Sequence, residues 1–200
     1  TDAGVHASGQ VIAFDLDWEH PEEALLRAMN ANLPLDAAAQ AVRVARPDFH
    51  PRYDARARRY QYRILCREVR APLRERYCWR VWPDASIEPM RRAAADLIGR
   101  HDFAAFGAPH HSGRSTVRNV IQAHWLEDGA ELVFEIVGNA FLYHMVRRIV
   151  STLVGIGQGV LPADLIRKRL AEPAGGMVPG LAPPAGLNLV EVIYPPERET

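Results

Sequence analysis

The segment from Val117 to Val137 constrains the fold of this 200-residue chain more than any other part of it. Two strand-like stretches, Val117 to Leu126 and Glu131 to Val137, flank the dipeptide Asp128-Gly129. Asp-Gly is a strong signal for a tight β-hairpin, because glycine accepts the positive φ angle that such a turn requires. The sequence therefore predicts an antiparallel pair of strands here.

Further strands are predicted from short segments in which side chains alternate between two faces. In the segment from Arg58 to Cys66, alternation places Tyr60, Tyr62 and Ile64 on one face. The opposite face carries Arg59, Gln61, Arg63 and Leu65. The remaining predicted strands are Gln10–Leu16, Ala39–Arg46, the short aromatic stretch Tyr77–Trp82, and Leu187–Tyr194.

Four helices are predicted from apolar periodicity and from residues typical of helix ends. Pro21-Glu22-Glu23 gives the first helix a proline and acids in its opening turn, where exposed N–H groups favour them. Ser86 is the expected N-cap of the second helix and Gly99 its expected stop. The predicted ranges are Pro21–Met29, Ile87–Ile98, Ala140–Ile156 and Ala163–Leu170. Helices interspersed with strands predict an α+β fold, with mainly antiparallel sheets and flanking helices.

The composition is ordinary for a folded protein, with 48% hydrophobic and 24% charged residues. Two cysteines, Cys66 and Cys78, make neither a disulfide framework nor a zinc site, which favours a reducing compartment. The longest apolar stretch, Ile149 to Leu161, is too short and too rich in glycine to span a bilayer. We therefore expect a soluble, cytoplasmic protein without a membrane partner. The chain opens with Thr1 and not with Met, so we expect the natural start to lie upstream.

The formal net charge is +0, but charges of opposite sign are segregated along the chain. Residues 1–50 hold eight acids and three arginines, whereas residues 52–80 hold ten arginines and three acids. Such a basic block can form a phosphate-binding face. A solvated surface of an arginine-rich protein explains it equally well, since Lys168 is the only lysine.

Three residues are candidates for chemistry, although each also has an ordinary structural explanation. Asp2 precedes Ala3-Gly4 in a predicted tight turn, where an aspartate commonly bonds its own backbone. Arg147 and Arg148 interrupt an otherwise apolar helix, so at least one guanidinium should face the interior or a cleft and needs an anionic partner. A structural salt bridge would meet that need. Tyr60 either packs in the sheet or presents its ring as a stacking surface for a base.

The sequence contains no recognisable metal-binding or nucleotide-binding motif. The pair His110-His111 lies in a predicted loop and the other histidines stand singly, so no zinc-ligand spacing results. Gly155, Gly157 and Gly159 follow a helix and not a strand, which argues against a dinucleotide-binding loop. A small hydrolase using His110, His111 and an acid is a remaining alternative, but no nucleophile pattern accompanies the pair.

Several motifs together resemble the tRNA pseudouridine synthase A family, in the family's order and over essentially the whole chain. The opening Thr1-Asp2-Ala3-Gly4-Val5-His6-Ala7 resembles the second half of the family's catalytic motif. The stretch from Phe141 to Ile149, within Asn139–Ile149, is the other highly specific match. The weaker matches are Asn30–Pro34, Phe49–Arg52 with Ala57–Tyr62, His101–Phe103 with Phe106, Thr116–Arg118, and Ala182–Leu187.

The resemblance implies a role for each of the three candidate residues. Asp2 matches the family's catalytic aspartate, and Arg147 matches the arginine that pairs with it. Tyr60 matches the tyrosine that packs against the target base, and Arg58 and Arg59 beside it are the expected substrate-binding arginines.

The resemblance also implies an architecture and an activity. The family fold is an α+β pair of similar sheet-based halves around a basic cleft. Residues 1–110 would be the remainder of the N-terminal half, and residues 111–200 the C-terminal half, in one continuous catalytic unit. Family members act as homodimers that isomerise uridines in the anticodon stem-loop of tRNA to pseudouridine, without a cofactor or a metal.

The chain departs from the family pattern at its start. The Gly-Arg that precedes the threonine in the family motif, and the family's first strand and helix, have no counterpart here. The alternative function is therefore a non-catalytic RNA-binding remnant of such an enzyme, which would use the same arginines and aromatics without turnover.

Overall fold

The computed structural model describes residues 1–109, 111 and 113–196, which divide into two compact units. The first unit comprises Thr1–Gln10 and Ala55–Thr200, and the second comprises Val11–Asp54. The second unit contains the helix α1 (Glu22–Asn32). The first unit contains the strands β1 (His6–Ala7), β2 (Ala57–Cys66), β3 (Trp79–Val81), β4 (Gly99–Asp102), β5 (Val117–Asp128), β6 (Glu131–Gly138) and β7 (Leu187–Ile193), and the helices α2 (Ile87–Ala95), α3 (Met145–Gly157) and α4 (Leu165–Ala171).

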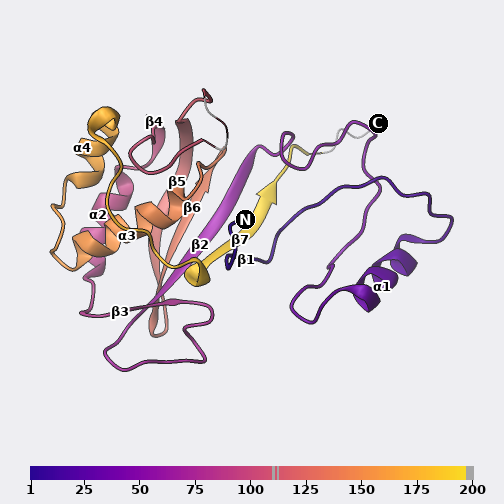
Figure 1. Cartoon of the computed structure of the whole chain (residues 1–200), viewed down its shortest axis with the longest axis horizontal. Helices are drawn as coiled ribbons and strands as arrows, with labels where there is room; N and C mark the ends of the chain where they lie inside the picture. Colours follow the sequence, from indigo (N-terminus) through magenta and orange to yellow (C-terminus); the bar gives the residue numbers. More distant parts are fainter. Residues whose placement is uncertain (110, 112, 197–200) are drawn as a thin grey trace. The chain divides into compact units, whose positions relative to one another are not determined.

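The seven strands of the first unit form one sheet in the order β1-β7-β2-β6-β5-β4, with β3 also paired to β2 (Figure 1). Neighbouring strands are antiparallel except for the pairs β1–β7 and β2–β3, which are parallel. The predicted α+β class with a mainly antiparallel sheet is thereby confirmed. The predicted halves 1–110 and 111–200 both contribute to this sheet, since β2 lies between β6 and β7; the division into halves itself stays a prediction.

The predicted hairpin is confirmed as β5 and β6. Gly129 has a φ of +60°, the left-handed conformation that the turn requires of its glycine. Across the pair, Trp125 lies opposite Phe134, with their ring centroids 5.2 Å apart. Cross-strand aromatic pairs of this kind help fix the register of the sheet.

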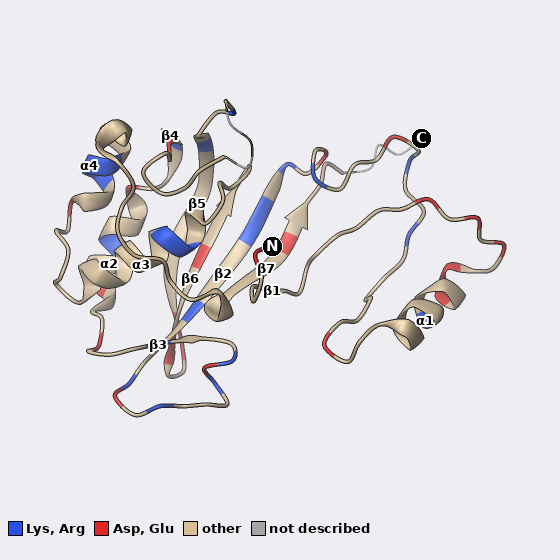
Figure 2. Cartoon of the chain, in the orientation of Figure 1, with Lys and Arg blue, Asp and Glu red and all other residues tan. Residues whose placement is uncertain are grey.

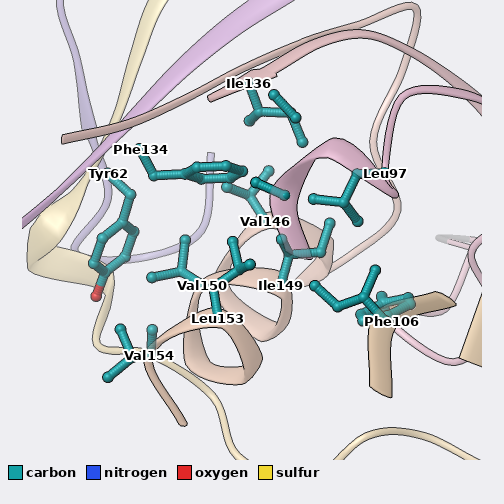
Figure 3. Close-up of a cluster of buried hydrophobic side chains, with 14 of the residues drawn as sticks. Tyr62, Leu97, Phe106, Phe134, Ile136, Val146, Ile149, Val150, Leu153 and Val154 are labelled. Carbon is teal, nitrogen blue, oxygen red and sulfur yellow. The ribbon is translucent and has the colours of Figure 1, made fainter. Parts of the chain in front are cut away.

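The core of the first unit lies where α3 packs against the central strands. Figure 3 shows Val146, Ile149 and Leu153 of α3 in one cluster with Phe134 of β6 and with Tyr62 of β2, whose ring lies at the left of the view. Fully burying an apolar side chain stabilises the fold by about 1.5–3 kcal/mol, so this contact anchors α3 firmly. The side chains on the other face of α3 are therefore held at defined positions beside the sheet.

Three helices start close to the predicted positions, but α3 begins five residues later than the predicted start at Ala140. Two hydrogen bonds hold the intervening segment out of the helix. The Asn139 side chain accepts a hydrogen bond from Ala140 N, and Tyr143 N donates to the carbonyl of Ala108. Gly99 also differs from prediction, because it opens β4 while α2 ends at Ala95.

The predicted strands Gln10–Leu16 and Ala39–Arg46 are wrong, since neither segment is a strand in the structure. Alternation fixes which side chains share a face, but a strand also needs a neighbouring strand for its backbone groups. In the second of these segments, backbone groups of Ala39 and Val44 are bonded to side chains instead. The Asn30 amide pairs with both backbone groups of Ala39, and Glu22 accepts from Val44 N.

No helix in the described part of the chain is both long enough and apolar enough to cross a membrane.

Candidate active site

Asp2 lies in a tight turn at one end of the sheet. Its carbonyl accepts a hydrogen bond from Val5 N at 3.1 Å, and Gly4 within the turn has a φ of +78°. A Cβ at Gly4 would lie 3.1 Å from Pro184, so glycine also permits close packing there. Immediately after the turn, β1 pairs in parallel with β7. The short strand thus fixes the position of Asp2.

The Asp2 carboxylate pairs with Arg147 of α3. Arg147 Nη1 donates to Asp2 Oδ2 at 3.1 Å, and their side chains are only 11% and 23% exposed. Arg147 Nε donates to the carbonyl of Ala182 at 2.8 Å. The guanidinium is therefore held from two sides and aimed at the carboxylate, and breaking such an enclosed pair costs roughly 3–5 kcal/mol.

Arg148 points to a different part of the molecule. Its Nη1 donates to the carbonyls of Val178 and Gly180, each at 3.3 Å. Of the two adjacent arginines in α3, Arg147 is thus the one that meets a carboxylate. The carbonyls of one loop, between α4 and β7, hold both side chains.

A pocket of about 170 Å³ opens beside the Asp2–Arg147 pair. Tyr60 of β2 lines it together with Phe141, and their rings meet edge to face with centroids 5.2 Å apart. Burial raises the pKa of the Tyr60 hydroxyl, Arg58 lowers it and Asp2 raises it. The net shift keeps Tyr60 a neutral phenol, whose ring presents apolar surface next to a carboxylate.

His144 also lines the pocket and lies against Asp2. Its Nε2 is 3.5 Å from Asp2 Oδ2, and its ring stacks on that of Tyr143 with centroids 3.6 Å apart. His144 has a φ of +65°, a left-handed conformation that is uncommon for a residue other than glycine. Burial lowers the pKa of His144, Asp2 opposes that shift, and Arg147 and Arg148 reinforce it.

The two predicted substrate-binding arginines lie on opposite faces of β2. Arg58 is on the face of Tyr60, and its Nη1 donates to the carbonyl of Asn139 at 2.6 Å. Arg59 is on the other face, where it pairs with Glu135 at 3.1 Å and with Glu191 at 3.3 Å. The structure therefore places Arg58 near Tyr60 but outside the pocket lining, and it engages Arg59 on the other face.

Much of the basic block at residues 52–80 is likewise paired with acids. Figure 2 shows a basic band on β2 beside acidic bands on β6 and β7. Glu131, only 3% exposed, accepts from both Arg63 and Arg74. Glu75 accepts from Arg70 and lies 3.6 Å from Arg80. Acids from outside the block therefore pair with Arg59, Arg63 and Arg74, and the block is less positive in the fold than its sequence indicates.

The histidine pair of the hydrolase alternative is only partly covered by the structure. His110 lies outside the described residues, and His111 is exposed. Among the residues that are described, no group of three or more His, Cys, Asp or Glu side chains is arranged to hold a metal ion.

Comparison with known sequences decides the family. A sequence model of the tRNA pseudouridine synthase family matches residues 93–195. The chain is 40% identical to tRNA pseudouridine synthase A of Limosilactobacillus fermentum over 196 residues, which cover 97% of this chain and 76% of the relative. The proteins of the same name from Myxococcus xanthus and Pseudomonas aeruginosa are 44% and 43% identical, over 99% and 100% of this chain and 76% and 70% of theirs.

The chain belongs to the tRNA pseudouridine synthase A family. This is a family of isomerases, and the predicted resemblance and enzyme class are thereby confirmed.

Three site residues that were predicted from the sequence by resemblance to this synthase family lie at one pocket in the structure. Asp2, Tyr60 and Arg147 come from the first turn, a central strand and a helix, yet all line the same cavity. Their functional roles stay predictions at this point. His144 was missed as a site residue by sequence reasoning, although it stands inside the family motif from Phe141 to Ile149.

Proposed function

We propose that this chain isomerises uridines in the anticodon stem-loop of tRNA to pseudouridine, with Asp2 as the nucleophile. The observation that carries the proposal is the Asp2–Arg147 ion pair, 3.1 Å long, in the wall of a pocket that Tyr60 also lines. A turn aspartate without such a partner, bonded only to its own backbone, would not suggest chemistry.

The reaction needs few groups from the protein. The bond between ribose C1′ and uracil N1 breaks, the base turns, and a bond forms between C1′ and C5. One proton leaves C5 and one is added at N1, so no electrons are gained or lost. Nucleophilic catalysis splits such a displacement into two easier steps.

Asp2 must be ionised to attack C1′, and Arg147 favours the ionised form. The cation beside the carboxylate stabilises the negative charge, while the Ala182 carbonyl fixes the guanidinium in place. The bond to C1′ then forms at an oxygen of the Asp2 carboxylate, in a residue that lines the pocket.

Tyr60 and Arg58 are the proposed contacts to the nucleotide and its backbone. Extracting a uridine from its stack costs a few kcal/mol, and stacking on one aromatic ring returns about 1–3 kcal/mol of that. Arg58 lies on the same face of β2 as Tyr60, where it can approach a phosphate of the bound loop. Arg59 contributes less, since Glu135 and Glu191 already engage it.

We further propose that the active form is a homodimer in the cytoplasm, as the resemblance implies. Exposed apolar side chains of the second unit, Ile12, Phe14 and Leu16, support an interface there, because soluble proteins seldom leave such side chains grouped in water. Sedimentation velocity of the purified chain measures the dimer directly. A monomer at every concentration would remove the dimer from the proposal.

The test of the activity is incubation of this chain with an unmodified tRNA transcript, followed by mapping of pseudouridine by carbodiimide treatment and primer extension. We expect modification in the anticodon arm, and we expect Asp2→Asn to abolish it. The matched control Asp164→Asn should retain it, because the Asp164 carboxylate pairs with Lys168 and does not line the pocket. Tight tRNA binding without any product from the parent chain would favour the non-catalytic RNA-binding alternative.

A further inference from the structure

We propose that His144 is the base that removes the proton from C5 of the uracil during isomerisation. This inference rests on the proposed function, because it presupposes that Asp2 attacks C1′. It adds the group needed in the second half of the reaction, in which C5 loses its proton after the new carbon–carbon bond has formed.

The first argument is reach. His144 Nε2 lies 3.5 Å from Asp2 Oδ2, the oxygen that also accepts from Arg147. In the reaction both the carboxylate oxygen and C5 must come within bonding distance of the same atom, C1′. A nitrogen that close to the carboxylate therefore borders the space in which C5 must approach C1′.

The second argument is the strained and supported geometry of His144. A φ of +65° outside glycine costs of order 1–3 kcal/mol, and such strain persists mainly where the surroundings impose it. Here α3 starts directly after His144, and the Tyr143 ring stacks on the imidazole at 26° between planes. The backbone and the stacked ring together fix the imidazole at the pocket wall.

The third argument is that the other side chains in the pocket are poorly suited to the task. Arg147 is permanently charged, and burial holds the proton on Tyr60. Once C5 has displaced it from C1′, the Asp2 carboxylate pairs again with Arg147, and a carboxylate paired with a guanidinium is a weaker base than a neutral imidazole. His144 is surrounded by Asp2, Arg147, Arg148 and Tyr143, and burial with the two arginines lowers its pKa. Its imidazole is accordingly neutral near pH 7 and has a lone pair to offer.

The proton transfers of this step balance without any further reactant. While Asp2 is ionised, its negative charge 3.5 Å from Nε2 favours the tautomer with its proton on Nε2. Bonding of Asp2 to C1′ removes that negative charge, so the tautomer with its proton on Nδ1 becomes favourable and exposes the Nε2 lone pair. C5 then displaces the carboxylate from C1′, its proton passes to Nε2, and the imidazolium returns one proton to N1 of the product.

The test uses the full chain and tRNA transcripts made with uridine or with 5-deuterouridine. In His144→Asn the backbone conformation is tolerated, since asparagine adopts positive φ readily, but no base remains. We expect turnover to fall about 10²- to 10⁴-fold with little change in KM, the usual contribution of a general base. We also expect a larger deuterium isotope effect than in the parent chain, because proton removal becomes the slow step.

A second variant separates chemistry from structure. His144→Gly suits the left-handed backbone equally well, and added imidazole should restore part of its turnover in proportion to the uncharged imidazole present. His124→Asn, a change at a half-exposed histidine on β5, is the control and should behave like the parent. An unchanged isotope effect and no rescue by imidazole would overturn the proposal. Absence of pseudouridine from the parent chain itself would instead overturn the function on which it rests.

Discussion

The strand β2 separates two regions that are both rich in charge. They differ in whether a carboxylate borders a pocket or is enclosed by arginines. On one face, Asp2 pairs with Arg147, and the Asp2 carboxylate borders a pocket. On the other face, Arg59 is engaged by two carboxylates and Gln61 donates to one of them. Near the hairpin turn, Glu131 is similarly enclosed by two arginines.

The ion pairs on the two faces differ in their surroundings more than in their lengths. The ion pairs have similar lengths, 3.1 Å for both Asp2–Arg147 and Glu135–Arg59. Only the first borders a cavity with aromatic walls, where a substrate atom can approach the carboxylate. The second joins three strands, β2, β6 and β7, because Arg59 on β2 pairs with Glu135 on β6 and with Glu191 on β7. Chemistry is therefore expected on the first face and structural support on the second.

The largest effect should come from matched carboxylate-to-amide changes on the two faces. Asp2→Asn should lower turnover by roughly a thousandfold or more, since it removes the proposed nucleophile while keeping the side-chain shape. Glu135→Gln should leave turnover within about threefold, because it lies on the sheet face away from the pocket. Single-turnover assays on a tRNA transcript measure both. Equal losses in the two variants would contradict the assignment of chemistry to one face.

Much of the pocket could be predicted from the sequence, because local motifs carry its chemical groups. Asp2 stands next to a glycine turn, and Arg147 interrupts an apolar helix that must be buried. That these two meet is a property of the fold. Parallel pairing of β1 with β7, and the bond from Arg147 to Ala182, join segments too distant in sequence for any local pattern to indicate.

The next effect concerns Tyr60 and sharpens what its face of β2 contributes. Tyr60→Ala should weaken transition-state stabilisation by about 1–3 kcal/mol, the usual value of one base–aromatic stack. Tyr60→Phe keeps the ring and its contact with Phe141, so it should lose much less. The ratio kcat/KM for each variant gives the comparison. Losses of the same size would assign the role to the hydroxyl and not to the ring.

A smaller effect, on stability and not on turnover, should come from the hairpin end of the sheet. Glu131→Gln removes a 3%-exposed carboxylate that binds Arg63 and Arg74, and it should lower the free energy of unfolding by about 1–3 kcal/mol. Glu127→Gln, whose carboxylate is 61% exposed, should change it by less than about 0.5 kcal/mol. Urea denaturation measures both. A loss of turnover in Glu131→Gln at temperatures where it is folded would place catalytic importance on this end.

The charge pattern along the sequence predicts the folded surface less well than the motifs predict the site residues, and the reason is physical. The block at residues 52–80 indicates a strongly basic face, but acids from distant strands pair with three of its arginines, Arg59, Arg63 and Arg74. Glu131 and Glu135 lie on β6 and Glu191 on β7, and they reach β2 only when the sheet forms. A charge count along the chain cannot include partners that the fold supplies. The strands predicted at Gln10–Leu16 and Ala39–Arg46 failed similarly, since alternation does not provide a neighbouring strand.

The smallest expected effect tests the comparison within β2 itself, using two adjacent arginines. Arg58→Gln should reduce the slope of log affinity for tRNA against log salt by about 0.7–0.9, as expected for one lost phosphate contact. Arg59→Gln should change that slope by clearly less, because Glu135 and Glu191 already neutralise this side chain on the opposite face. Filter binding of a tRNA transcript over a series of salt concentrations gives both slopes. If the two variants lost the same slope, the RNA would have to reach both faces of β2, and the separation of a catalytic face from a structural one would no longer hold.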